Sequence, residues 1–187
     1  YRPISDTLPD YLDVEGRENT LGAKAVAAPG ALLGWCEALE RFGTMPLADV
    51  IEPAIRHATR GFRATPFLVE CITDTAADLA LDPEMAKLYV PGGTPLKAGD
   101  RLVQGDYAET LRTIAKHGPG LLHGGAVGRM TADYFARAGG FLGFDDLTDY
   151  RTIEREVVRG TYRGFEIVGP PPPSSGGVHV IQMLNIL

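Results

Sequence analysis

Four histidines are the residues best suited to act as general bases or metal ligands in this sequence. None forms an H-x-x-x-H pair, and none stands beside a Cys, Asp or Glu at the spacing of a metal site. We expect His57 on a helix surface, His117 at a helix C-terminus and His123 in a loop. His179 is expected on a polar helix stripe that meets other polar groups of a larger protein. The sequence therefore predicts no metal site and no cofactor.

Two further groups of residues favour structural roles over chemistry. Asp145, Asp146 and Asp149 are close enough in sequence to suggest paired carboxylates. Capping of a short helical turn explains them better. The segment 118–128 contains a G-x-G string, but it lacks the strand–turn–helix frame of a phosphate-binding loop. Taken alone, the chain shows no complete active site.

Cysteine content points to reduced thiols. Cys36 and Cys71 are the only two cysteines, both lie in helical patterns, and they fit no metal spacing. Two buried thiols are favoured over a disulfide.

Composition indicates an ordinary globular protein with no nucleic-acid partner and no membrane span in this segment. The chain has 187 residues, of which 44% are hydrophobic and 22% charged, and its net charge is −6. A negative charge argues against nucleic acid as a partner. No apolar run approaches the ~20 residues of a membrane span. The sequence starts at Tyr1 without methionine or a signal sequence, so we expect a cut or processed start and cannot infer a compartment.

Hydrophobic periodicity predicts a mainly helical first part. Residues 1–30 are interrupted by Pro and Gly, with a short strand expected over 23–28. A short strand pair is expected within 91–105, and Asp106 with Glu109 resembles a capping box. Pro53 should kink or restart its helix. Helices are predicted over residues 31–42, 46–60, from 65 to about 79, 82–89, 106–117 and 125–138, with a capped turn over 144–150.

The last part of the chain changes period. Residues 153–158 and 162–168, on either side of Gly160, predict an antiparallel hairpin. Four prolines then give a stiff extended segment, and a serine after them is a good helix N-cap. Residues 178–187 are apolar except for a narrow polar stripe, which predicts a helix buried on most sides. This helix has no stop signal, so we expect the chain to end inside an element. A flexible linker is the other interpretation of the PPPPSSGG segment.

Helices followed by a hairpin and a buried helix predict an α+β fold, because the strands and helices are segregated rather than alternating.

Seven strings of this chain resemble, in the same order, the gamma-glutamyltranspeptidase family of N-terminal-nucleophile hydrolases. The resemblance implies an αββα fold, of which residues 1–187 would be the central part of the large subunit and an incomplete domain. The strings are residues 28–31 (APGA), 47–56 (LADVIEPAIR), 61–62 (GF), 95–100 (PLKAGD), 145–150 (D-x-L-x-x-Y), 160–165 (GTYRGF) and 171–177 (PPPSSGG).

The resemblance implies a precursor that cuts itself into a large and a small subunit. The cut exposes a threonine whose amine acts as its own base and whose hydroxyl attacks a gamma-glutamyl amide such as glutathione. In the family this threonine opens the small subunit, beyond the Pro-Ser-Ser-Gly-Gly segment. The implied partners are therefore the remainder of the same precursor and a small gamma-glutamyl substrate. No catalytic residue falls within this chain, and Ser174 to Gly177 are expected to be structural.

One substrate-binding residue is implied. The family places an arginine in a D-G-R-E-x-A-P-like string, where it pairs with the substrate's alpha-carboxylate. Arg2, in Tyr1-Arg2-Pro3, matches this position loosely. Arg17, in the EGRE string of residues 15–18, matches the letters better but lies closer to Pro29 than the family's spacing allows. We favour Arg2, with Arg17 as the alternative.

The departure from the usual arginine string leaves two other functions open. Relatives in the superfamily include acylases that act on cephalosporin or glutaryl amides. A helical interaction module without catalysis is the alternative from another class. In either enzyme reading, the chain alone should be inactive, because it contains no N-terminal Thr, Ser or Cys.

Overall fold

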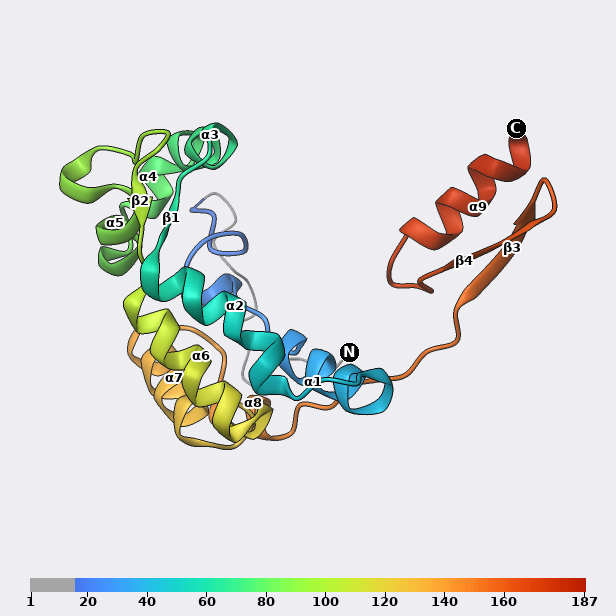
Figure 1. The fold of residues 1–187 in the computed structure, drawn as a ribbon, viewed down its shortest axis with the longest axis horizontal. Coiled ribbons are helices and arrows are strands. Elements are labelled where there is room, and N and C mark those ends of the chain that lie inside the picture. Colours follow the sequence, from blue (N-terminus) through green and yellow to red (C-terminus); the bar gives the residue numbers. More distant parts are fainter. Residues whose placement is uncertain (1–15) are drawn as a thin grey trace. The chain divides into compact units, whose positions relative to one another are not determined.

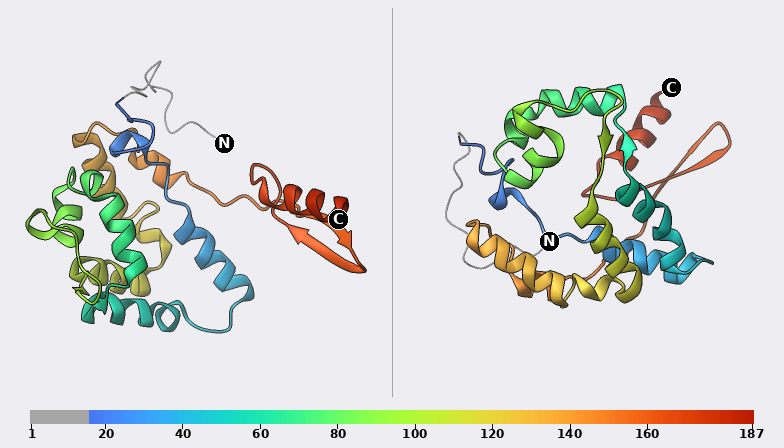
Figure 2. Two further views of the ribbon diagram at one scale, coloured as in Figure 1. Left: turned by 90° about the horizontal axis from the view of Figure 1, so that it is seen from above. Right: turned by 60° about the vertical axis from the view of Figure 1, so that its left-hand side comes forward.

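The computed structural model describes residues 16–187, and the chain divides into two compact units, residues 1–151 and 152–187. The first unit consists of helices and one short strand pair, and the second is a hairpin with one helix (Figures 1 and 2). This order confirms the predicted α+β organisation. The elements are η1 (Ala23–Ala25), α1 (Ala31–Phe42), α2 (Leu47–Arg60), β1 (Phe62–Arg63), α3 (Pro66–Asp74), α4 (Ala76–Leu79), α5 (Pro83–Tyr89), η2 (Pro91–Gly93), β2 (Arg101–Leu102), α6 (Gly105–His117), η3 (Pro119–Leu121), α7 (Ala126–Arg137), α8 (Phe144–Thr148), β3 (Val158–Tyr162), β4 (Phe165–Gly169) and α9 (Gly176–Ile186).

The core of the first unit lies between α2 and α6, which run side by side (Figure 1). Ile55 and Ala58 of α2 pack with Ala108 and Leu111 of α6, all buried. These residues recur at helical spacing on each helix, so each apolar stripe meets the other. Pro53 lies inside α2, which continues to Arg60, so the helix does not restart at this residue, and the expected kink stays a prediction. Packing against α6 therefore outweighs the hydrogen bond that a proline cannot donate.

Side-chain caps start several helices where the sequence predicts them. Thr65 Oγ1 accepts from the amide of Leu68 at 3.2 Å, and Asp82 Oδ1 accepts from the amides of Glu84 and Met85 at 3.0 and 2.9 Å. Each cap precedes a proline at the start of its helix, a position at which the missing amide hydrogen costs nothing.

The predicted capping box at Asp106 is wrong. Helix α6 begins one residue earlier, at Gly105, after Gln104, and no side chain caps it. Glu109 instead accepts from Arg112 at 2.5 Å along the helix surface. The box requires Asp106 to precede the helix, but residue 106 already lies within its first turn.

Three other local predictions are also corrected. Residues 23–25 form a 3₁₀ turn, and no strand forms over 23–28. The strand pair joins β1 to β2 across about forty residues, with Phe62 opposite Leu102, so its first strand lies outside 91–105. The periodicity of residues 125–138 predicts that Val127, Met130, Tyr134 and Phe135 face inward. The buried residues of α7 are instead Gly128 and Ala132, and Met130 and Tyr134 are exposed.

The second unit is a hairpin whose turn differs from the predicted one. Strands β3 and β4 pair antiparallel from Val158 opposite Gly169 to Tyr162 opposite Phe165. The turn is Arg163-Gly164, with φ values of 50° and 88°, as a two-residue hairpin turn of this hand requires. Gly160 lies within β3 and not at the turn.

Helix α9 explains why glycine stands at position 160. The helix packs on β3 and β4, and a Cβ at Gly160 would lie 2.6 Å from Ile181 Cγ2. The predicted helix therefore forms, and one face of it is covered by the hairpin. The other face, which includes Val180, Met183 and Ile186, is exposed in this chain. No described helix is long and apolar enough to cross a membrane.

Candidate functional site

The favoured substrate ligand, Arg2, lies outside the described residues, so its role stays a prediction. The alternative, Arg17, lies in a turn with φ of 64°. Its two terminal nitrogens donate to the two carboxylate oxygens of Asp78, at 2.8 and 2.7 Å. A forked guanidinium matched to both oxygens of one carboxylate is the strongest geometry of an ion pair. Arg17 therefore already holds a carboxylate of its own chain.

This ion pair shifts the ionisation of both partners. The hydrogen bonds from Arg17 lower the pKa of Asp78 below its ordinary value of 3.8, and Asp78 in turn raises the pKa of Arg17. The side chains are 55% and 30% exposed, so solvent screens the attraction. The pair links the turn around residue 17 to α4, and nothing in the local sequence pattern indicates it.

The histidines lie where the sequence predicts, apart from one unexpected contact. His57 is exposed on α2, and His117 is the last residue of α6. His179 is exposed on α9. Within the described residues, no group of three His, Cys, Asp or Glu side chains could hold a metal ion.

His123 is built into the interior of the first unit. Its Nδ1 lies 3.0 Å from the carbonyl oxygen of Leu147, and its ring lies 5.5 Å from that of Tyr150. Its Nε2 is buried and has no hydrogen-bond partner. The ring thus joins the loop after η3 to the end of α8, which is a structural role.

Two of the family-like strings meet at the same place. Tyr150 lies so close to Gly30 that a Cβ at residue 30 would overlap the tyrosine hydroxyl and ring. Gly30 directly precedes α1, so Tyr150 fixes the start of that helix. The contact spans 120 positions, which explains why periodicity could not reveal it.

The glycines of segment 118–128 serve close packing of the backbone. A Cβ at Gly125 would lie 2.6 Å from the carbonyl oxygens of Gly120 and Leu121, and one at Gly128 would overlap that of Leu122. The loop is folded against its own helix and does not form a phosphate cradle. Asp146 likewise acts as a cap, because its Oδ2 accepts from the amide of Gly143 at 2.8 Å.

Within the Ser174–Gly177 string, Gly177 has a structural role. A Cβ at Gly177 would overlap the carbonyl oxygen of Pro170 and lie 2.9 Å from the carbonyl carbon of Gly169. This glycine lets α9 begin directly beside the end of β4. Ser175 precedes the helix, but its side chain makes no capping hydrogen bond, unlike the prediction.

The free thiols differ in their surroundings. Cys36 and Cys71 form no disulfide, which agrees with the prediction. Cys36 is half-buried on α1, and burial raises the pKa of its thiol. Cys71 is exposed on α3, so the expectation of two buried thiols is wrong for this residue.

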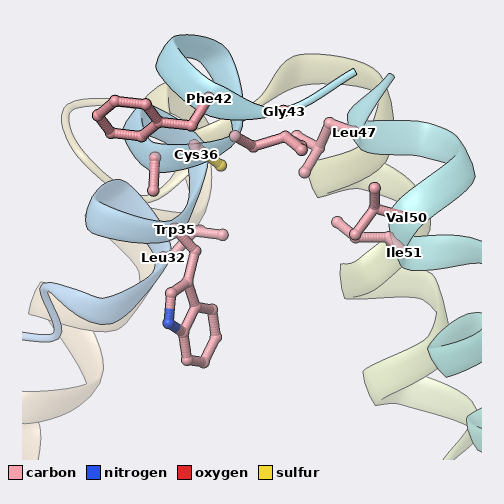
Figure 3. A pocket seen from close by; sticks show the side chains of 10 residues that line it. Leu32, Trp35, Cys36, Phe42, Gly43, Leu47, Val50 and Ile51 are labelled. Carbon is pink, nitrogen blue, oxygen red and sulfur yellow. The ribbon is translucent and has the colours of Figure 1, made fainter. Parts of the chain in front are cut away.

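A groove of about 520 Å³ between α1 and α2 is the feature that sequence reasoning missed (Figure 3). We call it the α1–α2 groove. Its lining side chains are apolar apart from the indole nitrogen of Trp35 and the thiol of Cys36, so the groove suits apolar groups better than charged ones. Figure 3 shows Val50 and Ile51 of α2 directed toward α1. The lining residues are Leu32, Trp35, Cys36, Ala38, Leu39, Phe42, Gly43, Leu47, Val50 and Ile51.

Comparison with known proteins relates the whole chain to one family. Residues 3–187 match the family model described as Gamma-glutamyltranspeptidase. The chain is 58% identical to Acylase ACY 1 proenzyme of Pseudomonas sp. (strain V22), covering 100% of this chain and 34% of that protein. It is 35% identical to Glutathione hydrolase proenzyme of Escherichia coli (strain K12), covering 99% of this chain and 33% of that protein.

The fold gives the same result. The crystal structure of gamma-glutamyltranspeptidase from Helicobacter pylori superposes with a TM-score of 0.90 at 31% identity, covering 98% of this chain and 54% of that chain. The chain spans about a third of the length of the curated relatives, which are named as proenzymes. The resemblance and the N-terminal-nucleophile hydrolase fold inferred from seven short strings are therefore confirmed. The chain belongs to the gamma-glutamyltranspeptidase family.

Proposed function

We propose that residues 1–187 form the central part of the large subunit of a precursor whose mature form transfers or hydrolyses gamma-glutamyl groups of glutathione and related amides. The observation that carries this proposal is the match of residues 3–187 to one family model. The names of the relatives as proenzymes support a longer precursor that includes this segment.

The nucleophile of this enzyme lies outside the chain. A threonine at the start of the small subunit attacks the amide carbon, while its own amine takes the hydroxyl proton and then delivers it to the leaving amine. This step leaves a gamma-glutamyl ester on the enzyme. Water or the amine of an acceptor amino acid then attacks the ester, and the threonine hydroxyl is restored.

The role of this chain is to position the substrate. We assign Arg2 to the alpha-carboxylate of the gamma-glutamyl group, where a guanidinium donates two parallel hydrogen bonds. The engagement of Arg17 with Asp78 supports this choice, because an arginine that already holds a carboxylate must lose that pair before it can hold another.

An acylase is the second candidate function. The observation that favours it is the 58% identity to Acylase ACY 1 proenzyme, against 35% to Glutathione hydrolase proenzyme of Escherichia coli. The acylase chemistry is the same acyl transfer through the N-terminal threonine. The difference lies in the acyl group, because a glutaryl group keeps the terminal carboxylate of a gamma-glutamyl group but lacks its ammonium group.

Three nitroanilides tested on the full-length mature protein distinguish these functions. The gamma-glutamyl compound has both the carboxylate and the ammonium group, the glutaryl compound only the carboxylate, and the gamma-aminobutyryl compound only the ammonium group. We expect the highest kcat/KM for the gamma-glutamyl compound. A higher value for the glutaryl compound would favour the acylase, and no turnover of any of them would contradict both. The isolated chain of residues 1–187 is the control and should be inactive.

A further inference from the structure

Residues 64–100 form a separate lobe of the first unit, which we call the α3–α5 lobe. It contains α3, α4, α5 and η2, and in sequence it lies between α2 and α6, which pack on each other. Its buried residues, Ala64, Ile72 and Val90, do not belong to the core cluster between α2 and α6. Among the described residues, the helices of the lobe pack on one another, and none has an extensive contact with α1, α2, α6, α7 or α8.

Two short strands join the lobe to the α2–α6 core (Figure 1). Strand β1 leads from the end of α2 into the lobe, and β2 leads from the lobe back to α6. The pairing of the strands continues beyond them, because the amide of Ala64 donates to the carbonyl of Asp100 at 2.8 Å. The amide of Gly99 donates to the carbonyl of Ala64 at 2.9 Å. The strands and the lobe therefore form one continuously hydrogen-bonded body.

The points at which the strands meet the helices have the features of a hinge. Gly61, between α2 and β1, has φ of 71° and ψ of 165°, a conformation nearly exclusive to glycine. Gln104 directly precedes α6, and its amide donates to the carbonyl of Ala58 at 3.0 Å. Its side chain donates to the hydroxyl of Tyr89 at 3.2 Å, so this contact lies at the hinge itself. Hinge motions are absorbed by a few such residues at the ends of elements.

Two side-chain contacts join α4 and α5 to other parts of the first unit. Arg17 donates to both carboxylate oxygens of Asp78, in α4, at 2.8 and 2.7 Å. The hydroxyl of Tyr134, in α7, donates to Oδ2 of Asp82, the cap of α5, at 3.3 Å. Both contacts are exposed to solvent, where an ion pair or a hydrogen bond shifts an equilibrium by roughly two- to tenfold.

We propose that the α3–α5 lobe is a hinged body that swings about Gly61 and Gln104. The Arg17–Asp78 and Tyr134–Asp82 contacts are the two clips that hold it closed. A segment with few buried apolar residues and exposed contacts is the kind that opens before the rest of a protein. The inference concerns the mechanics of the first unit and does not depend on which amide the mature enzyme cleaves.

The distance between two nitroxide labels on the full-length mature protein, measured by pulsed electron spin resonance, tests the hinge. Cys71 is exposed on α3, and Ala136→Cys places the second label at an exposed position of α7. All other cysteines are replaced by serine. We expect a single distance with both clips intact. In the double variant Asp78→Asn with Tyr134→Phe, we expect a second, longer distance in at least about a tenth of the molecules.

The same two chemical changes outside the clips provide the matched control. Asp74, at the end of α3, and Tyr107, on α6, are exposed, and neither side chain has a hydrogen bond or ion pair among the contacts of the described residues. The double variant Asp74→Asn with Tyr107→Phe should therefore keep the single distance. Equal distance distributions in the two double variants would overturn the proposal.

A second label pair separates a swing of the lobe from its unfolding. Thr94 is exposed in the lobe, directly after η2, so Thr94→Cys together with Cys71 gives a distance inside the lobe. If the lobe swings as one body, this distance stays the same when both clips are removed. A change in this distance would show that the lobe loosens internally, and the hinge proposal would then be wrong.

The outcome is separable from that of the activity assay. A mature protein whose lobe swings but which cleaves no gamma-glutamyl amide would retain the hinge and refute the proposed substrate. A protein that cleaves the amide and shows one distance in both double variants would refute the hinge alone.

Discussion

At the scale of single residues, the two candidate arginines make different predictions. A lysine keeps the charge of Arg2 but cannot form two parallel hydrogen bonds with one carboxylate. In the mature enzyme, Arg2→Lys should therefore lower kcat/KM for the gamma-glutamyl nitroanilide by roughly tenfold to a hundredfold. This is the effect expected from the loss of a charge-assisted pair. The loss should shrink for the gamma-aminobutyryl compound, which has no carboxylate to hold.

Arg17→Lys is the matched control. Its partner is Asp78, and the pair is largely exposed, so we expect less than about a twofold change in kcat/KM. If Arg17→Lys lowers kcat/KM for the gamma-glutamyl compound selectively and Arg2→Lys does not, the assignment of the two arginines is reversed.

The Arg17–Asp78 pair also predicts a pH dependence of stability. The pKa of Asp78 is lowered in the folded protein, so the pair stabilises it fully above the ordinary value of 3.8. This contribution is lost as the pH falls through the lowered pKa, because the carboxylate is then protonated in both states. Measured by urea unfolding, the free energy of unfolding of wild type should therefore exceed that of Asp78→Asn from neutral pH down to about pH 5. The two values should converge in stronger acid.

A neighbouring carboxylate is the control for this measurement. Asp74, exposed at the end of α3, has no carboxylate hydrogen bond among the contacts of the described residues. Asp74→Asn should leave the pH profile of wild type unchanged in shape. A constant difference between wild type and Asp78→Asn down to the most acid pH would argue against the ion pair.

What the sequence can predict at this scale depends on distance along the chain. The caps at Thr65, Asp82 and Asp146 act on amides two or three residues away, so the pattern of residues contains them. The Arg17–Asp78 pair joins residues 61 positions apart. Such a contact depends on how the helices pack, and no local pattern encodes it.

At the scale of elements, adjacent glycines at the start of α9 make a paired prediction. A methyl group at Gly177 would meet the backbone of Pro170 and Gly169, which cannot move aside without disturbing β4. At Gly176 it would meet only Ser174 Oγ, at 3.7 Å. Gly177→Ala should destabilise the second unit by about 1–3 kcal/mol. Gly176→Ala should be neutral or stabilise it by up to about 1 kcal/mol.

Hydrogen exchange of the β3 and β4 amides reports on this unit directly. Faster exchange in Gly177→Ala, with wild-type protection in Gly176→Ala, is the expected result. Equal protection in both variants would mean that the helix start has room for a side chain at residue 177, contrary to the close approach described above.

The helices of the first unit follow from periodicity, and the errors concern faces and turns. The pattern predicts a buried stripe on α2 that includes Val50, Ala54 and Ala58. Only Ala58 of these is buried, and Ile55, outside the predicted stripe, is buried with it against α6. The predicted face of α7 is also wrong, since Met130 and Tyr134 satisfy a helical period but are exposed. The sequence predicts the hairpin turn around Gly160, because glycine is common in turns. The structure shows a different reason for glycine at this position, since a side chain there would collide with Ile181 of α9. The alternating pattern of a strand gives no sign of this contact.

At the scale of the whole molecule, the family could be inferred from strings that are individually weak. Some of them mark positions at which packing restricts the residue type, as Gly30 against Tyr150 and Gly177 beside Pro170 illustrate. The α1–α2 groove could not be inferred, because an apolar helix stripe does not reveal whether its neighbour belongs to the same segment.

The central claim is that this segment belongs to the large subunit of a precursor that cuts itself to expose a nucleophilic threonine. Mass spectrometry of the purified full-length precursor, during incubation without any protease, tests this most directly. We predict two chains, with residues 1–187 entirely within the larger one and a threonine at the N-terminus of the smaller. A single uncut chain that turns over the gamma-glutamyl nitroanilide, or a cut inside residues 1–187, would contradict the account.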